Sequence, residues 1–556
     1  MTSSDTSVRS SSSNSSSSNQ HDWWRSAVIY QIYPRSFADA NGDGIGDLKG
    51  VIEHLDYLKH LGIDALWLSP FYRSPQADAG YDVSNYRDVD PMFGTLADFD
   101  TLLDGAHERG IRVIVDLVPN HSSDEHEWFQ AALKSAADSP ERKRYLFRKG
   151  KGPNSDQPPN NWPSVFGGSA WTRVEGEDQW YLHLFDTKQP DYDWRNPEVR
   201  EEFESILHFW LDRGVDGFRV DVAHSLIKEP DLRDLTDDEL NATYNIGPMW
   251  DQDEVHDIYR AWRKILNQYP GNRMMVAEAW VKPQERLSHY IRSDEMQQAF
   301  NFDYLLTHWN AKELRQVIDD SLAQSALVGA PTTWVMSNHD GVRQASRFGL
   351  SDPGARPNGI GPNDEQPDEA LGLQRARASI FLTFLLPGSL YIYQGEELGL
   401  PDNTTMDPKY RQDPTFFRTH GKELGRDGCR VPLPWKSHAP SFGFGPSDKS
   451  WLPQPDNYAH YAVDIEENDP ESTLALYRTL LGLRKEHALG SGHLQWLDSP
   501  NEAVLVARNG DVVTMVNTGT EPVALLPGRI LAHSLPGEAP EHQLPGNAAV
   551  WLYDAK

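Results

Sequence analysis

Three acidic residues, each closing a short apolar run, have the types and spacing that could do chemistry in this chain. Asp221 ends Gly-Phe-Arg-Val-Asp, Glu278 ends Met-Val-Ala-Glu, and Asp340 ends Val-Met-Ser-Asn-His-Asp. An acid alone at any of these positions is more often a helix cap or the partner of an arginine. Together, at the ends of strand-like runs of a β/α repeat, the three acids would point into one shared crevice. We therefore expect them to form a reaction centre.

Hydrolysis of a glycosidic bond requires one acid that protonates the leaving oxygen and one carboxylate that meets the developing positive charge. Asp221, Glu278 and Asp340 supply both groups, and the third acid can bind sugar hydroxyl groups. The pattern is typical of a glycosidase.

The elements that must position these acids alternate between strand-like and helix-like segments from residue 27 onward. Eight strands interleaved with helices predict a (β/α)8 TIM barrel of the α/β class, with the acids at its carboxyl end. The expected strands are 28–33, 65–68, 112–118, 217–220, 275–277, 299–302, 332–336 and 390–393. The clearest expected helices are 48–61, 96–109, 197–213, 254–267, 371–386 and 472–487.

The alternation breaks after the third strand, where Pro, Gly, Asn and Trp clusters with little helical period predict a small inserted domain. Short alternating runs between turn residues near the end of the chain predict an antiparallel β-sandwich domain. The expected organisation is a disordered Ser-rich tail at 1–21, a catalytic barrel at 22–121 and 190–488 with an excursion at 396–468, the inserted domain at 122–189, and the C-terminal β domain at 489–556.

The composition limits the kinds of partner that the protein is expected to bind. The 52 basic and 82 acidic residues among 556 give a net charge of −30, which argues against nucleic acid and anionic membranes and favours a neutral small-molecule substrate. The single cysteine, Cys429, excludes an intrachain disulfide framework and suits a reducing compartment. The first twenty residues lack the apolar core of a secretory signal. We expect a cytoplasmic protein that is a monomer or a weak homo-oligomer.

Several motifs in order resemble those of glycoside hydrolase family 13, the α-amylase family. Asp-Leu-Val-Pro-Asn-His at 116–121, the run ending at Asp221, the acid Glu278 and the pair His339-Asp340 match successive family motifs. Gln-Pro-Asp-Tyr-Asp at 189–193 is similar to the Gln-Pro-Asp-Leu-Asn motif of the oligo-1,6-glucosidase-like branch. The resemblance to α-glucosidases of that branch covers about residues 23–556.

The resemblance implies a role for each acid. Asp221 would be the nucleophile, Glu278 the general acid/base and Asp340 the stabiliser of the transition state, with net retention of configuration. A retaining mechanism expects the carboxyl groups of Asp221 and Glu278 about 5 to 5.5 Å apart. The same motifs imply that His121, Arg219 and His339 contact the sugar in the cleavage subsite.

A closed pocket is also implied by the resemblance. Asp78 would bind the hydroxyl groups of the non-reducing sugar, Tyr81 would stack beneath its ring, and Arg430 would pair with Asp78 and close the pocket. Phe166 is expected to line the pocket or, alternatively, to be a core aromatic of the inserted domain. A closed end implies exo action on short chains.

A loop with oxygen ligands at alternate positions follows the first strand. The family places a structural Ca²⁺ or Mg²⁺ in this loop, and a metal-free turn rich in Asp and Asn is the alternative. No organic cofactor is expected. The ligands would be Asp39, Asn41, Asp43, the carbonyl group of Ile45, and Asp47.

The sequence therefore predicts a retaining exo-acting α-glucosidase that releases terminal glucose from short α-glucosides, maltose-type substrates first, with transglucosylation as a possible second outcome. Two departures from the relatives, Val222 after the nucleophile and Gly341 after the stabiliser, leave the bond preference open. The alternatives are an oligo-1,6-glucosidase, a sucrose- or trehalose-directed relative, and a non-catalytic transporter-associated homologue.

Overall fold

The centre of the molecule is a sheet of eight parallel strands, seen in a computed structural model that describes residues 22–242, 245–355 and 357–554. The expected tail at 1–21 lies outside the described residues. Neighbouring strands pair in the order β11-β10-β9-β5-β2-β1-β13-β12, which confirms the predicted (β/α)8 fold class. The strands are β1 (Val28–Ile32), β2 (Ala65–Leu68), β5 (Arg112–Leu117), β9 (Gly217–Val220), β10 (Met274–Ala277), β11 (Gln298–Ala299), β12 (Thr333–Val335) and β13 (Ser389–Tyr393).

The sheet order ends at β11 and β12, and a side chain joins these two edges. Thr333 Oγ1 in β12 donates a hydrogen bond to the carbonyl oxygen of Ala299 in β11, at 2.6 Å. The expected strand at 299–302 is wrong beyond Ala299, because β11 ends there and the chain turns into the short helix α10 (Phe302–Leu305). Asn301 starts this helix by accepting a hydrogen bond from the backbone N–H of Tyr304.

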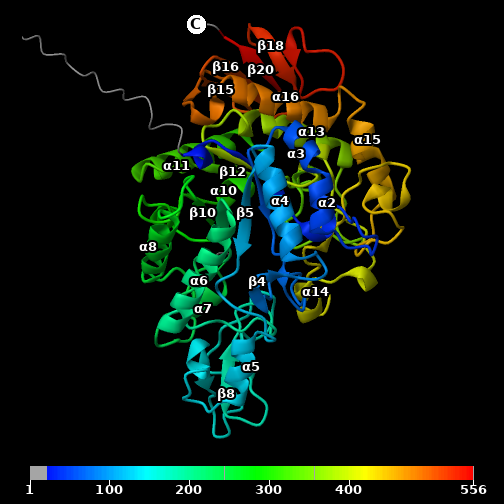
Figure 1. Ribbon diagram of the computed structural model, residues 1–556. Coiled ribbons are helices and arrows are strands. Elements are labelled where there is room, and N and C mark those ends of the chain that lie inside the picture. Colours follow the sequence, from blue (N-terminus) through cyan, green and yellow to red (C-terminus); the bar gives the residue numbers. More distant parts are fainter. Residues whose placement is uncertain (1–21, 243–244, 356, 555–556) are drawn as a thin grey trace, which may run out of the picture.

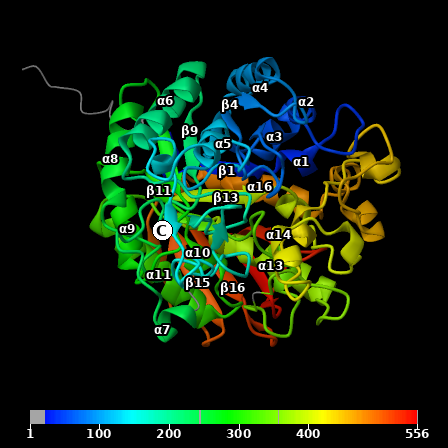
Figure 2. The same cartoon turned by 90° about the horizontal axis from the view of Figure 1, so that it is seen from below.

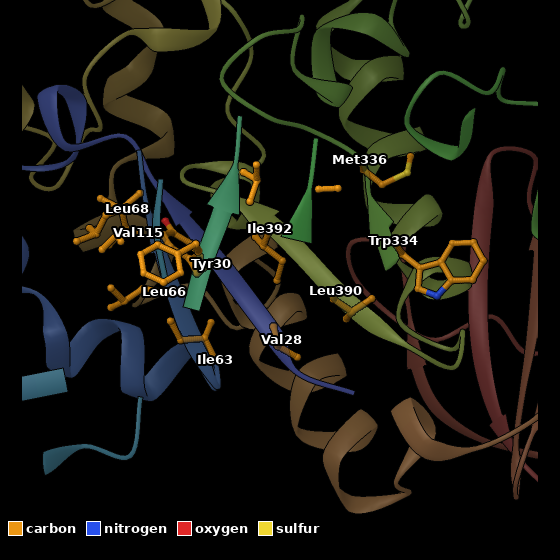
Figure 3. Packing of buried hydrophobic residues seen from close by; sticks show 14 of the residues in the cluster. Val28, Tyr30, Ile63, Leu66, Leu68, Val115, Trp334, Met336, Leu390 and Ile392 are labelled. Atoms are coloured by element: carbon orange, nitrogen blue, oxygen red, sulfur yellow. The ribbon is translucent and has the colours of Figure 1, made fainter. Parts of the chain in front are cut away.

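Alternate residues along the strands pack into two separate clusters, as the period of two in a β-strand requires. One set, including Tyr30, Leu66 and Val115, packs toward the surrounding helices (Figure 3). The other set, including Trp67 and Ile114, packs inside the barrel. Burial on both faces explains why the strands appear in the sequence as continuous apolar runs.

Helices surround the sheet (Figure 2). Gly214 adopts a left-handed conformation (φ 103°) at the end of α6, as its position in the sequence suggests. The expected helix 48–61 is two helices, because His54 leaves the helical conformation between them. The main helices are α2 (Leu48–Glu53), α3 (Leu55–Leu61), α4 (Leu96–Glu108), α6 (Pro197–Arg213), α8 (Val255–Leu266), α11 (Ala311–Leu327), α13 (Glu369–Thr383) and α16 (Thr473–Glu486).

Two smaller units lie at opposite ends of the barrel (Figure 1). Between β5 and α6 the chain forms α5 (Glu127–Lys134) and a small antiparallel sheet of β6 (Phe147–Lys149), β8 (Gln179–Leu182) and β7 (Trp171–Arg173). The C-terminal unit contains the antiparallel sheet β14 (Leu494–Trp496), β15 (Val504–Asn509), β16 (Val512–Asn517), β20 (Ala548–Tyr553) and β18 (Arg529–His533), with the pair β17 (Val523–Ala524) and β19 (Gln543–Leu544).

No helix among the described residues is long and apolar enough to cross a membrane.

Candidate active site

Most of the predicted site residues lie around a cavity of about 230 Å³ at the carboxyl ends of the strands. His339 and Arg430 are not on its surface; both are buried behind its wall. The predicted residues that line the cavity are Asp78, Tyr81, His121, Phe166, Arg219, Asp221, Glu278 and Asp340.

Arg219, which lies in β9 and is buried, joins three carboxyl groups at the floor of the cavity. Its Nη1 donates to Asp116 Oδ1 at 3.0 Å and to Asp221 Oδ1 at 2.5 Å, and its Nη2 donates to Glu278 Oε2 at 2.7 Å. The register of the parallel strands explains this meeting, because Arg219 is paired with Asp116 in β5 and with Val276 in β10. One guanidinium therefore holds Asp221 and Glu278 side by side.

Crowding of acids around one cation shifts the pKa values of the group. Burial raises the pKa of Asp221 well above its usual value, and the carboxyl groups of Glu278 and Asp116 add to this increase while Arg219 opposes it. Burial also raises the pKa of Asp116 to about 7, again against the effect of Arg219. Such a site favours additional positive charge, which is the charge that develops on a sugar ring during glycosidic cleavage.

Asp340, the third predicted acid, faces two arginines. Its Oδ1 accepts from Arg430 Nη2 at 2.9 Å and from Arg426 Nη1 at 3.3 Å. Burial acts to raise the pKa of Asp340, but the guanidinium groups of Arg426 and Arg430 hold it well below its usual range. Asp340 is therefore ionised, with its side chain 30% exposed to the cavity.

His339 is a neutral imidazole held between Gln31 and Tyr81. Burial lowers its pKa well below the usual value. Gln31 Nε2 lies 2.7 Å from its Nδ1 and the Tyr81 hydroxyl lies 2.5 Å from its Nε2. The Tyr81 and His339 rings stack 5.4 Å apart at an angle of 11°. Through these contacts His339 supports Tyr81, whose ring faces the cavity.

Asp78 pairs with Arg426, so the predicted pairing of Asp78 with Arg430 is wrong. Arg426 Nη2 is 2.7 Å from Asp78 Oδ1, whereas Arg430 donates to Asp340 and, through Nε, to the His339 carbonyl oxygen at 2.8 Å. The two arginines lie at the start and the end of the short helix η5 (Asp427–Arg430), so their side chains reach different acids. Asp413 Oδ2 also accepts from Arg426 Nε.

The inserted segment supplies one side of the cavity. Phe166 lines it, and the guanidinium of Arg426 lies 5.0 Å from the centre of its ring. Gln189 Nε2 donates to Asp78 Oδ2 and lies next to His121 Nε2, both at 3.1 Å. Burial lowers the pKa of His121 to about 4. The motif at 189–193 did not predict a role for Gln189, and its contacts with two predicted site residues indicate that it holds them in place.

Trp280 and Arg426 were not recognised in the sequence as cavity residues, and the backbone conformation of Val222 was not expected. Trp280, two residues after Glu278, lines the cavity and donates from Nε1 to Glu278 Oε1 at 3.2 Å. Val222 follows Asp221 with a positive φ of 43°, which is rare and strained for a β-branched residue. Position near the predicted acid Glu278 was the available signal for Trp280.

The expected metal loop is held by its own hydrogen bonds. Asp39 accepts from the backbone N–H groups of Asn41, Gly42 and Gly44, and Asp43 Oδ1 accepts from Ile45. Carboxylate and carbonyl oxygens are the donors that Ca²⁺ and Mg²⁺ prefer, so the loop fits such a cation by ligand type. Within the residues that the structure describes, however, no group of three His, Cys, Asp or Glu side chains is placed to hold a metal ion.

Comparisons with known proteins agree over most of the chain. Residues 31–492 match the model of the alpha-amylase catalytic domain. The oligo-1,6-glucosidase of Parageobacillus thermoglucosidasius is 36% identical, over 92% of this chain and 93% of its own. The probable alpha-glucosidase of Rhizobium meliloti (strain 1021) is 38% identical, over 86% and 85%. The solved structure of the trehalulose synthase MutB from Pseudomonas mesoacidophila MX-45 has a TM-score of 0.84 at 33% identity, covering 96% of this chain and 99% of that one.

Proposed function

The chain belongs to the α-amylase family, glycoside hydrolase family 13, and from this premise we propose that it is a retaining exo-acting α-glucosidase. It hydrolyses terminal, non-reducing α-linked glucose from short α-glucosides. The observation that carries the proposal is the shared guanidinium of Arg219, which bonds both Asp221 and Glu278. Carboxyl groups held side by side suit retention, since an inverting enzyme needs about 6.5 to 9.5 Å between them to admit water.

In the proposed reaction Asp221 attacks the anomeric carbon while Glu278 gives its proton to the glycosidic oxygen. The C–O bond to the leaving sugar breaks with its electron pair, and a covalent glucosyl ester with Asp221 forms. Glu278, now ionised, takes a proton from water, and that water releases glucose from Asp221. A sugar hydroxyl group in place of the water gives transglucosylation.

The proposed exo action rests on the closed end of the cavity. The buried pair of Asp78 and Arg426 lies beside Phe166, and Asp340 is held by Arg426 and Arg430. Asp78 and Asp340 present carboxylate oxygens that accept hydrogen bonds from the hydroxyl groups of one terminal glucose. A chain that extended past this glucose would meet the ion pair, so the pocket takes chain ends.

The bond beyond the terminal glucose is set by residues on the other side of Glu278. Val222 and Asn245 line the cavity, and the backbone N–H of Val222 donates to Glu278 Oε2. The relatives include an oligo-1,6-glucosidase and a trehalulose synthase, so α-1,6 and sucrose- or trehalose-type substrates form the second proposal. A non-catalytic, transporter-associated role is less economical, because the three acids and Arg219 form a connected site.

Three further properties belong to the proposal. A Ca²⁺ or Mg²⁺ ion bound by Asp39, Asn41, Asp43, the Ile45 carbonyl group and Asp47 would be structural, and the alternate spacing of these oxygens supports it. Cytoplasmic location is supported by the single cysteine, Cys429, which is buried. A monomer or weak homo-oligomer is the proposed state.

Glucose release from maltose, isomaltose, sucrose, trehalose and maltotriose tests the proposal. We expect the highest kcat/KM on maltose-type substrates. In Asp221→Asn the rate should fall by about 10⁴-fold or more, because the covalent step needs the nucleophile. Asp498→Asn, at an exposed acid of the C-terminal unit, is the control. Undiminished release by Asp221→Asn, or internal cleavage of long starch chains, would contradict the proposal.

A further inference from the structure

We propose that Trp280 is a positioning residue for Glu278, which makes Oε1 the oxygen that carries and transfers the proton. The inference rests on the proposed function and deepens it by assigning the proton to one carboxyl oxygen. The contacts of the two Glu278 oxygens carry it, because they differ in number and kind.

Glu278 Oε2 already accepts two hydrogen bonds. Arg219 Nη2 donates to it at 2.7 Å and the backbone N–H of Val222 donates at 3.1 Å. A proton on this oxygen would compete with a buried cation and a backbone donor. Within the described part of the chain Oε1 accepts from Trp280 Nε1 alone, at 3.2 Å, and so retains room for the transferable proton.

The indole of Trp280 is held in one plane by an aromatic neighbour. Its ring stacks on Phe302 at 3.7 Å with an angle of 6° between the planes. Phe302 in turn packs against Phe300, and Phe300 packs against Trp67, whose Nε1 donates to Asp116 Oδ2 at 3.1 Å. This row of packed aromatic rings therefore positions the indole N–H groups of Trp280 and Trp67. They donate to Glu278 and Asp116, two carboxyl groups that also bond to Arg219.

The Trp280 contact becomes stronger as the proton leaves. When the O–H bond at Oε1 breaks, its electron pair stays on the carboxyl group and the proton forms the new bond to the glycosidic oxygen. Negative charge then appears on Oε1, and the hydrogen bond from an N–H donor to a carboxylate is stronger than the bond to a carboxylic acid. An interaction that gains strength along the reaction path lowers the barrier.

The test compares two leaving groups of similar shape, phenyl and 4-nitrophenyl α-glucosides, in wild type and Trp280→Phe. The variant keeps an aromatic ring against Phe302 but has no N–H donor. We expect kcat/KM for the phenyl glucoside, which needs protonation, to fall about ten-fold or more, and that for the 4-nitrophenyl glucoside by less than about two-fold. Trp496→Phe is the matched control, because the indole of Trp496 donates to Asp319 Oδ1 far from the site. In this variant the ratio of kcat/KM for the phenyl glucoside to kcat/KM for the 4-nitrophenyl glucoside should equal that of wild type.

Equal losses on the two substrates in Trp280→Phe would show that Trp280 acts only by packing and would overturn the inference. A higher KM with unchanged kcat on both substrates would assign Trp280 to binding alone and would overturn it as well. Thermal unfolding of the variant shows whether the fold is kept. Failure of the wild-type enzyme to hydrolyse either substrate would instead overturn the proposed function.

Discussion

At the scale of single residues, one arginine of the site bonds several acids, and two neighbouring arginines bond different sets of acids. Arg219 neutralises part of the charge of Asp116, Asp221 and Glu278. Arg426 and Arg430 share Asp340, but only Arg426 reaches Asp78. The sequence pointed to Arg430 as the partner of Asp78, and it gave no sign that the nearby Arg426 takes this place. The pairing depends on the direction of each side chain from η5.

The corrected pairing gives the first prediction. Arg426→Lys should raise KM for maltose about ten-fold with a smaller effect on kcat, because Lys cannot bond Asp78 and Asp413 together. Arg430→Lys, the matched variant, should lower kcat more than it raises KM, since it weakens the support of Asp340 and the bond to the His339 carbonyl group but leaves the pair of Asp78 and Arg426 in place. Steady-state kinetics on maltose measure both. A KM effect in Arg430→Lys but not in Arg426→Lys would restore the pairing that the sequence suggested.

At the scale of elements, strands were easier to predict than their ends. The runs of β2 and β10 are apolar because both faces are buried, so the sequence shows them directly. Residues 299–302, which are apolar except for Asn301, fit a strand equally well, but Asn301 caps α10 there. The helices α2 and α3 were predicted as one because the apolar period continues through His54. Local hydrogen bonds, which the period does not contain, decide these boundaries.

The loop at 39–47, before α2, gives the prediction at this scale. If a cation binds there, Ca²⁺ should raise the melting temperature of the wild-type protein by about 2 °C or more relative to EDTA, because a ligand of the folded state stabilises it. In Asp43→Asn the difference should shrink, while Asp498→Asn should keep it. Differential scanning calorimetry measures these shifts. Equal melting temperatures with Ca²⁺ and with EDTA would favour the metal-free turn.

At the scale of the whole molecule, the pocket is assembled from stretches far apart in the chain. The barrel supplies the acids, the inserted segment supplies Phe166, and the excursion after β13 supplies Arg426. Arg418 connects the excursion to the inserted segment, because its Nε donates a hydrogen bond to the Gly167 carbonyl oxygen at 2.9 Å. The C-terminal sheet lies at the opposite end of the barrel (Figure 1). Motifs in the sequence predicted many of the residues that line the pocket, but contacts such as Arg418 with Gly167 involve no recognisable motif.

The proposed roles of Asp221 as nucleophile and Glu278 as acid/base require that the reaction retain the α configuration. Proton NMR of glucose released from maltose in the first minutes, before the anomers interconvert, tests this requirement directly. We expect α-glucose from the non-reducing end to appear first and the β anomer to follow only by mutarotation. Initial release of β-glucose from that end would show inversion and would contradict both roles.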